Sequence, residues 1–124
     1  TVGGLCVPQG ERGECIKGFE PQGDEAVVEK RMPNAVNNTG LHELLQSYGH
    51  LDLIVCGFMS HSSVSTTVRA SKDYGYRCTL VADACATRDL PQGDGVLAAA
   101  KVQEAEMAIM RDNFAAVAMT GDLL

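Results

Sequence analysis

The chain has 124 residues, of which 45% are hydrophobic and 21% are charged, and this composition is typical of one globular domain. No apolar run approaches the roughly 18 residues that cross a bilayer. The net charge of −6 argues against a nucleic-acid partner, because phosphate binding depends on clustered Lys and Arg. The cysteines number five and form no CxxC pair, which argues against a disulfide framework or zinc ribbon and favours a reducing, cytoplasmic compartment.

The first third of the chain predicts loop and one helix. Residues 1–23 are rich in Gly and Pro and predict an irregular segment. A short strand is predicted around Val27 and Val28, and more loop follows it. Apolar residues at helical spacing from Leu41 to Tyr48 then predict a helix, which Gly49 ends.

Helices and strands alternate through the remainder of the chain. Residues 51–57 form a continuous apolar run that predicts a strand buried on both faces of a parallel sheet, with Cys56 in the core. A second helix is predicted from near Ser63 to Gly75. The other predicted elements are a buried strand at 78–83, a loop at 88–95, an alanine-rich helix at 96–113 and a strand at 115–120.

This alternation predicts an α/β fold, specifically a three-layer α/β/α arrangement around a parallel sheet in one domain, residues 1–124. Three core strands are few, and the edge beside residues 53–57 would be an aggregation hazard if it stayed open. We therefore expect one or more strands N-terminal to Thr1 to be missing from this sequence. The helix at 96–113 has a second apolar face, which predicts a homo-oligomer.

Ligands bind at the carboxyl ends of the strands in open α/β sheets. The first strand ends at Gly57 and is followed by FMSHSS and a helix start, where free N–H groups favour a nucleophile and an oxyanion hole. The candidate pocket residues here are Phe58, His61 and Ser62. At the second strand end, we expect Asp83 and Asp89 to cap or to pair with Arg88.

Three stretches together resemble the isochorismatase-like cysteine hydrolases: EKRMPNAVNNTGL (29–41), VCGFMSHSSVSTTVRAS (55–71) and GYRCTLVADACATRDLP (75–91). The family includes isochorismatases, nicotinamidases, N-carbamoylsarcosine amidases and ureidoacrylate amidases. The resemblance covers about residues 20–121 and matches the C-terminal two-thirds of the family's domain. It implies hydrolysis of a C–N amide or related bond in a small molecule, no cofactor, and a dimer or tetramer.

The resemblance also implies roles for individual residues. The family's catalytic Lys falls on Lys30, and its nucleophilic Cys falls on Ser63. The backbone N–H groups of Met59 and Ser63 would form the oxyanion hole, beside a cis peptide bond between Phe58 and Met59. The family's catalytic Asp would lie upstream of Thr1 and has no counterpart here. Metal-binding members use an Asp-x-His arrangement with further His residues, which this sequence does not contain, so no metal is expected.

The serine at position 63 leaves several functions open. A hydroxyl is much less acidic than a thiol, and a helix dipole is worth only about 0.3–1 kcal/mol. Ser63 would need a general base, for which His61 is the nearby candidate. We therefore expect a hydrolase that is weak or inactive, with Ser63 either natural or a replacement for Cys. The alternatives are a non-catalytic small-molecule-binding or assembly subunit, and a fragment without independent function. Cys85 is a weaker candidate for a replacement nucleophile.

Overall fold

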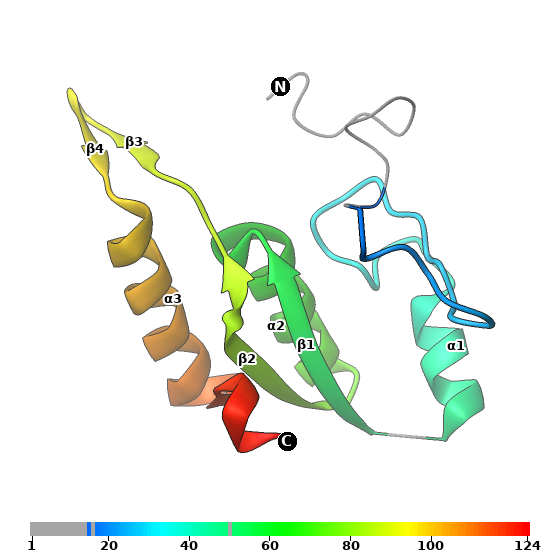
Figure 1. Cartoon of the computed structure of the whole chain (residues 1–124). Helices are drawn as coiled ribbons and strands as arrows, with labels where there is room; N and C mark the ends of the chain where they lie inside the picture. The colour runs from blue at the N-terminus through cyan, green and yellow to red at the C-terminus, as the bar shows by residue number, and fades with distance from the viewer. Residues whose placement is uncertain (1–14, 16, 50) are drawn as a thin grey trace.

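A computed structural model describes residues 15, 17–49 and 51–124 of the chain. Its centre is a parallel sheet in the order β1-β2-β5, formed by Asp52–Phe58, Arg77–Ala86 and Ala115–Ala118 (Figure 1). Helix α2 (Ser65–Asp73) connects β1 to β2, and helix α3 (Ala99–Asn113) precedes β5. The prediction of an α/β fold with a parallel sheet flanked by helices is therefore confirmed.

Five smaller elements complete the described chain. They are helix α1 (Leu41–Tyr48), the π-helical turn η1 (Ser60–Val64), the antiparallel hairpin β3 (Leu90–Gln92) and β4 (Gly95–Leu97), and the 3-10 turn η2 (Thr120–Asp122). No helix in the described part of the chain is long and apolar enough to span a membrane.

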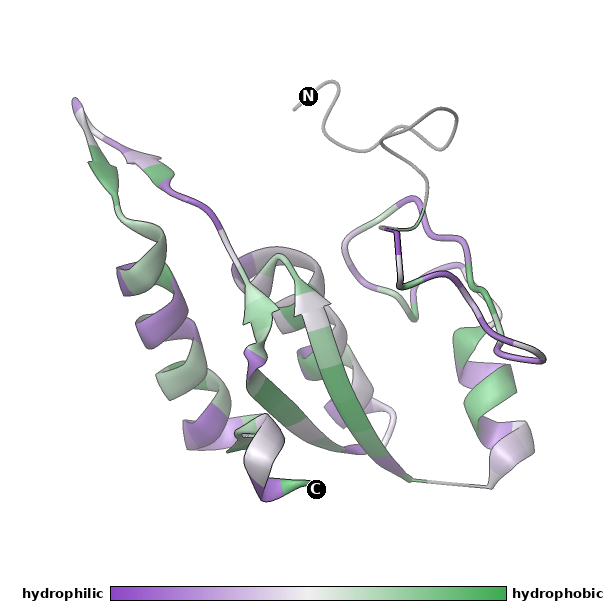
Figure 2. Cartoon of the chain, viewed as in Figure 1, coloured by the Kyte–Doolittle hydropathy of each residue, from purple (hydrophilic) through white to green (hydrophobic). Residues whose placement is uncertain are grey.

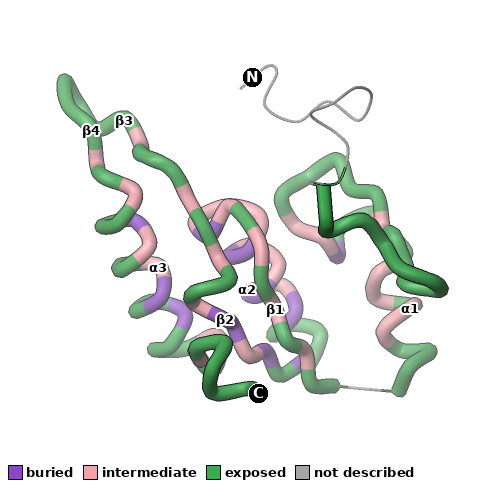
Figure 3. Tube along the Cα trace, in the orientation of Figure 1, coloured by how far each residue is buried: buried purple, intermediate pink, exposed green. Residues whose placement is uncertain are grey.

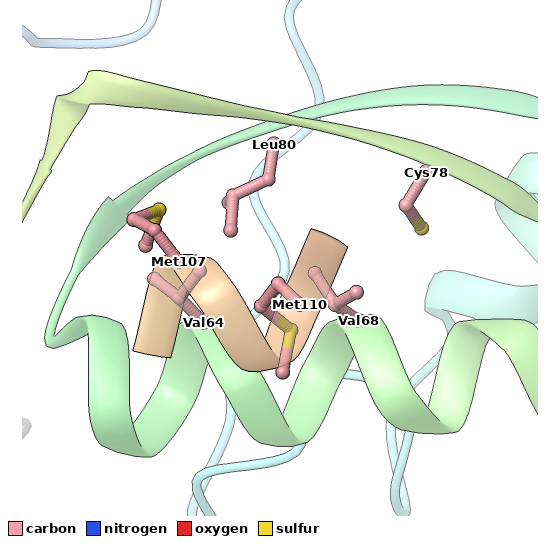
Figure 4. Packing of buried hydrophobic residues seen from close by; sticks show 6 residues of the cluster. All are labelled: Val64, Val68, Cys78, Leu80, Met107 and Met110. Atoms are coloured by element: carbon pink, nitrogen blue, oxygen red, sulfur yellow. The ribbon is translucent and has the colours of Figure 1, made fainter. Parts of the chain in front are cut away.

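The core lies between the sheet and the two connecting helices, which pack on the same sheet face. Each of these helices connects one strand to the next strand of the sheet, and the two connections run in the same direction across it. Right-handed connections of this kind place both helices on the same face of the sheet. Figure 4 shows the side chains that meet there, and Figure 3 shows that buried residues concentrate in these elements. The buried cluster comprises Val64, Val68, Cys78, Leu80, Met107 and Met110.

Strand β1 is apolar along most of its length (Figure 2), but only one of its faces is covered. Leu53 and Val55 pack against the core cluster, whereas Ile54 is 68% exposed and Cys56 is also exposed. The predictions of a strand buried on both faces and of Cys56 in the core are wrong for the described structure. Side chains of a strand alternate between faces, and α2 and α3 both cover the face of Leu53 and Val55.

Several predicted boundaries also differ from the structure. Val27 and Val28 form no strand with any described part of the chain, and Val27 is 67% exposed. The predicted loop at 88–95 forms most of the β3–β4 hairpin, with Gly93 at a φ of +55° in its turn. Since β4 extends to Leu97, helix α3 begins later than predicted.

Candidate active site

The structure brings Lys30 and Ser63 together at the carboxyl end of β1. Lys30 Nζ donates a hydrogen bond to Ser63 Oγ at 3.1 Å, across 33 positions of sequence. The same ammonium group donates to the carbonyl oxygens of Met32 at 3.1 Å and Pro33 at 3.2 Å. Three acceptors match the three N–H donors of a lysine side chain, so the ammonium group is fixed with one donor directed at Ser63.

The segment that carries Lys30 is itself attached to helix α2. The backbone N–H of Ala35 donates to Thr67 Oγ1 at 3.0 Å, and the Thr67 hydroxyl lies 3.5 Å from Pro33 O. Val36, the next residue, is only 5% exposed. Ser63 and Thr67 are one helical turn apart, so the helical segment that holds Ser63 also anchors the segment that brings Lys30 to it.

The chain turns sharply between β1 and the first helical turn. The peptide bond between Phe58 and Met59 is cis, as the resemblance implied. Gly57 precedes it with a φ of +123°, a conformation that glycine adopts without steric cost. The carbonyl oxygen of Met59 accepts hydrogen bonds from Ser62 N at 3.0 Å and Val64 N at 3.3 Å. Helical backbone therefore begins at Ser60, three residues before the predicted start.

The three candidate pocket residues have different surroundings. Phe58 is 61% exposed, and Ser62 is half-buried beside Ser63. His61 Nδ1 lies 2.6 Å from Thr87 Oγ1, at the end of β2. Among the described residues, His61 thus bonds to the neighbouring strand end and not to Ser63. This contact gives His61 a structural role in joining the turn to β2.

The acidic residues at the end of β2 serve the fold. Asp83 Oδ1 accepts the backbone N–H and the hydroxyl of Thr120, and these hydrogen bonds hold the pKa of the carboxyl below its usual range. Asp89 Oδ1 accepts the N–H of Ala99 at 2.8 Å and so caps helix α3. Arg88 donates to the backbone carbonyl of Asp89. Asp83 and Asp89 thus accept the first N–H groups of η2 and of α3, so of the two expected alternatives the described residues show capping and not ion pairing with Arg88.

The free thiols nearest this turn are those of Cys56 on β1 and Cys85 on β2. Cys15, Cys56, Cys78 and Cys85 are all free. Burial raises the pKa of Cys85, with smaller effects from its neighbours, and burial also raises the pKa of Cys78. A raised pKa lowers the thiolate fraction, and with it the nucleophilicity of Cys78 and Cys85, at a given pH. No group of three His, Cys, Asp or Glu side chains in the described residues is arranged to hold a metal ion.

Sequence reasoning missed two residues that contact each other beside the turn, Ser60 and Gln103. Ser60 is fully buried, and its Oγ lies 2.5 Å from Gln103 Oε1. One signal could have identified Gln103. It lies four residues before Met107 and seven before Met110, so it interrupts the apolar face of α3 with an amide. A polar residue on a core face needs hydrogen-bond partners, which predicts a buried polar contact.

The structure combines a parallel α/β sheet with a strand–turn–helix segment at the carboxyl end of β1. Proteins with open parallel sheets of this class bind their ligands at the carboxyl ends of the strands. The isochorismatase domain matches residues 2–122, and the chain belongs to the isochorismatase family. The fold resembles the crystal structure of an isochorismatase from Pseudomonas putida, with 67% identity and a TM-score of 0.94 over 100% of this chain and 64% of that chain.

Three further relatives are similar over most of this chain. A cysteine hydrolase from Pseudomonas syringae pv. phaseolicola has 29% identity and a TM-score of 0.87, over 90% of this chain and 53% of that chain. An isochorismatase family protein from Bacillus subtilis is 40% identical over 113 residues, which are 91% of this chain and 63% of the relative. A streptothricin hydrolase from Streptomyces noursei is 38% identical over 94 residues, 73% of this chain and 34% of its own length. This chain therefore spans between about a third and two thirds of these curated relatives.

Proposed function

We propose that the chain carries the nucleophile side of a hydrolase site that acts on a C–N amide or related bond of a small molecule. Residue 63 attacks the carbonyl carbon, and an Oγ–C bond forms while the C–N bond breaks. The nitrogen takes up a proton and leaves as ammonia or an amine, and water then hydrolyses the ester. The N–H groups of Met59 and Ser63 stabilise the oxyanion that forms in each step.

The observation that carries this proposal is the hydrogen bond between Lys30 Nζ and Ser63 Oγ at 3.1 Å. A fixed ammonium group beside a nucleophile favours the negative charge that develops there. Two of the relatives are described as a cysteine hydrolase and a streptothricin hydrolase, which supports a hydrolytic reaction. The amide class of substrate rests on the resemblance of the sequence to the family.

Ser63 makes the attack weak in this chain. A hydroxyl becomes a good nucleophile when a neighbouring base takes its proton. Among the described residues, the hydrogen-bond partner of Ser63 Oγ is Lys30, an ammonium group that donates and cannot accept. His61 bonds to Thr87 instead. We therefore propose low or absent hydrolysis by the chain with Ser63.

The same substitution favours a second candidate, a non-catalytic subunit that binds a small molecule or assembles with copies of itself. Such a subunit would keep the turn and Lys30 without a reactive thiol. The exposed face of α3, where Ile109 is 43% exposed, is the surface that we propose for such a homo-oligomer.

Ammonia release from a panel of primary amides separates these functions. The chain with Ser63 is expected to release no more ammonia than Ser63→Ala, whereas Ser63→Cys is expected to exceed both on at least one amide. Release by the original chain that Ser63→Ala abolishes would show that Ser63 is an effective nucleophile and overturn the proposed weakness. No release from Ser63→Cys, together with ordinary reactivity of its new thiol, would favour the binding subunit.

A further inference from the structure

The pairing between β1 and β2 is irregular next to the candidate site. Val55 lies opposite Leu80, but Gly57, two residues further, lies opposite Cys85. Five steps along β2 therefore correspond to two steps along β1. An irregularity of this kind removes backbone N–H and C=O groups from the hydrogen bonds between the two strands. Where such groups are buried, they need other hydrogen-bond partners.

One side chain from α3 supplies partners at this irregularity. Gln103 Nε2 donates to the carbonyl oxygen of Ala82 at 3.1 Å and lies 3.4 Å from that of Cys85. On its other side, Gln103 Oε1 accepts the hydroxyl of Ser60 at 2.5 Å. Ser60 Oγ also lies 3.0 Å from the carbonyl oxygen of Ala86, so its single proton is shared between two acceptors.

The chemistry of the side chain fits this position closely. A glutamine amide offers two N–H donors and one acceptor oxygen, and the contacts at Gln103 use donors toward the carbonyls and the acceptor toward the hydroxyl. The reverse orientation of the amide would direct its oxygen at two carbonyl oxygens. A glutamate would lack both donors, and a leucine would leave the Ser60 hydroxyl and two carbonyls with fewer partners.

We infer that Gln103 is a positioning residue for the turn at residues 59–63, through its hydrogen bonds to Ser60 and to the irregular end of β2. Ser60 is the first residue of η1 and lies directly after Met59, whose carbonyl oxygen accepts the N–H groups of Ser62 and Val64. Holding Ser60 therefore holds the backbone N–H groups of Met59 and Ser63, and keeps Ser63 Oγ beside Lys30. The catalytic role of this turn rests on the proposed function, whereas the positioning of the turn by Gln103 is independent of that function.

The test compares Gln103→Leu with Gln92→Leu, the same change at an exposed position of the β3–β4 hairpin. Amide hydrogen exchange is measured on the full chain. In Gln103→Leu, exchange at Ser62 and Val64 is expected to rise roughly fivefold or more, as the loss of a buried hydrogen bond predicts. Exchange at Tyr74 and Gly75, at the far end of α2, is expected to stay unchanged, and Gln92→Leu is expected to change neither pair.

A second readout reports on the site chemistry. In the Ser63→Cys background, Gln103→Leu is expected to raise the midpoint of the pH–rate profile for alkylation of the new thiol. Ser60→Ala is expected to have a similar effect, and the two changes together little more than either alone, because they break one connection. A variant that is merely less stable would lower the unfolding midpoint without moving the pH–rate profile of the folded protein.

The outcomes separate this inference from the proposed function. Unchanged exchange at Ser62 and Val64 in Gln103→Leu would overturn the positioning role, whatever the reactivity at position 63. Faster exchange at those amides, with ordinary reactivity of the thiol in Ser63→Cys, would support the positioning role and contradict the proposed hydrolase site.

Discussion

Replacement of Ser63 by cysteine is expected to create a thiol that reacts with iodoacetamide at lower pH than an ordinary thiol. A free cysteine has a pKa of about 8.5, whereas a cysteine at a helix start beside a lysine titrates at about 3.5–7.5. Lys30 Nζ lies 3.1 Å from the Oγ position that the sulfur would take. The pH–rate profile for Ser63→Cys should therefore have its midpoint below about 7.5.

The midpoint is a better readout than the rate at pH 7, because the intrinsic nucleophilicity of a thiolate falls as its pKa falls. The matched control is Ser62→Cys, one residue away in the same turn, since Ser62 makes no hydrogen bond to Lys30 in the described structure. The exposed Cys15 and Cys56 give internal reference rates in the same sample. Equal profiles for Ser63→Cys and Ser62→Cys would contradict a tuned nucleophile position.

The second large effect concerns stability. Leu80→Ala is expected to lower the free energy of unfolding by about 2–5 kcal/mol, the range for a fully buried leucine. Leu80 is 0% exposed and belongs to the cluster between the sheet and helices α2 and α3. Urea denaturation of the chain measures the change, with the slope of unfolding free energy against urea expected to stay constant.

The control for Leu80→Ala is Ile54→Ala in the neighbouring strand. Ile54 is 68% exposed, so its truncation is expected to change the free energy of unfolding by no more than about 0.5 kcal/mol. Similar large losses for both variants would contradict the description of β1 as covered on one face. Such a result would show that a further element or a second copy covers Ile54 in solution.

The alternation of strands and helices could be predicted from the sequence, because a strand is indicated by a short apolar run and a helix by apolar residues at helical spacing, and both patterns are local. The prediction failed at Ile54 and Cys56, since an apolar run specifies that both strand faces are suited to burial but not which face is covered. It also failed at Val27 and Val28, which form no strand with any described part of the chain. The hairpin at 90–97 was not predicted, because the Pro and Gly residues of this segment are typical of loops.

At the candidate site, the resemblance supplied Lys30, Ser63 and the cis peptide bond after Phe58, none of which follows from periodicity. The contact between Lys30 and Ser63 spans 33 positions, and local patterns carry no information on such a distance. The hydrogen bond of His61 to Thr87 depends on the length of β2, which continues three residues beyond the predicted strand. Gln103 could have been noticed as a polar residue on an apolar helix face, but its partners could not have been named.

The central claim is that Lys30 and residue 63 act as a pair. The most direct test is the pH–rate profile of thiol alkylation in Ser63→Cys with and without Lys30→Met, a change that keeps the length of the side chain and removes its charge. We predict that Lys30→Met raises the midpoint by roughly one pH unit or more, since a neighbouring positive charge lowers the pKa of a thiol by that order. An unchanged midpoint would show that Lys30 does not act on position 63 and would contradict the proposed site.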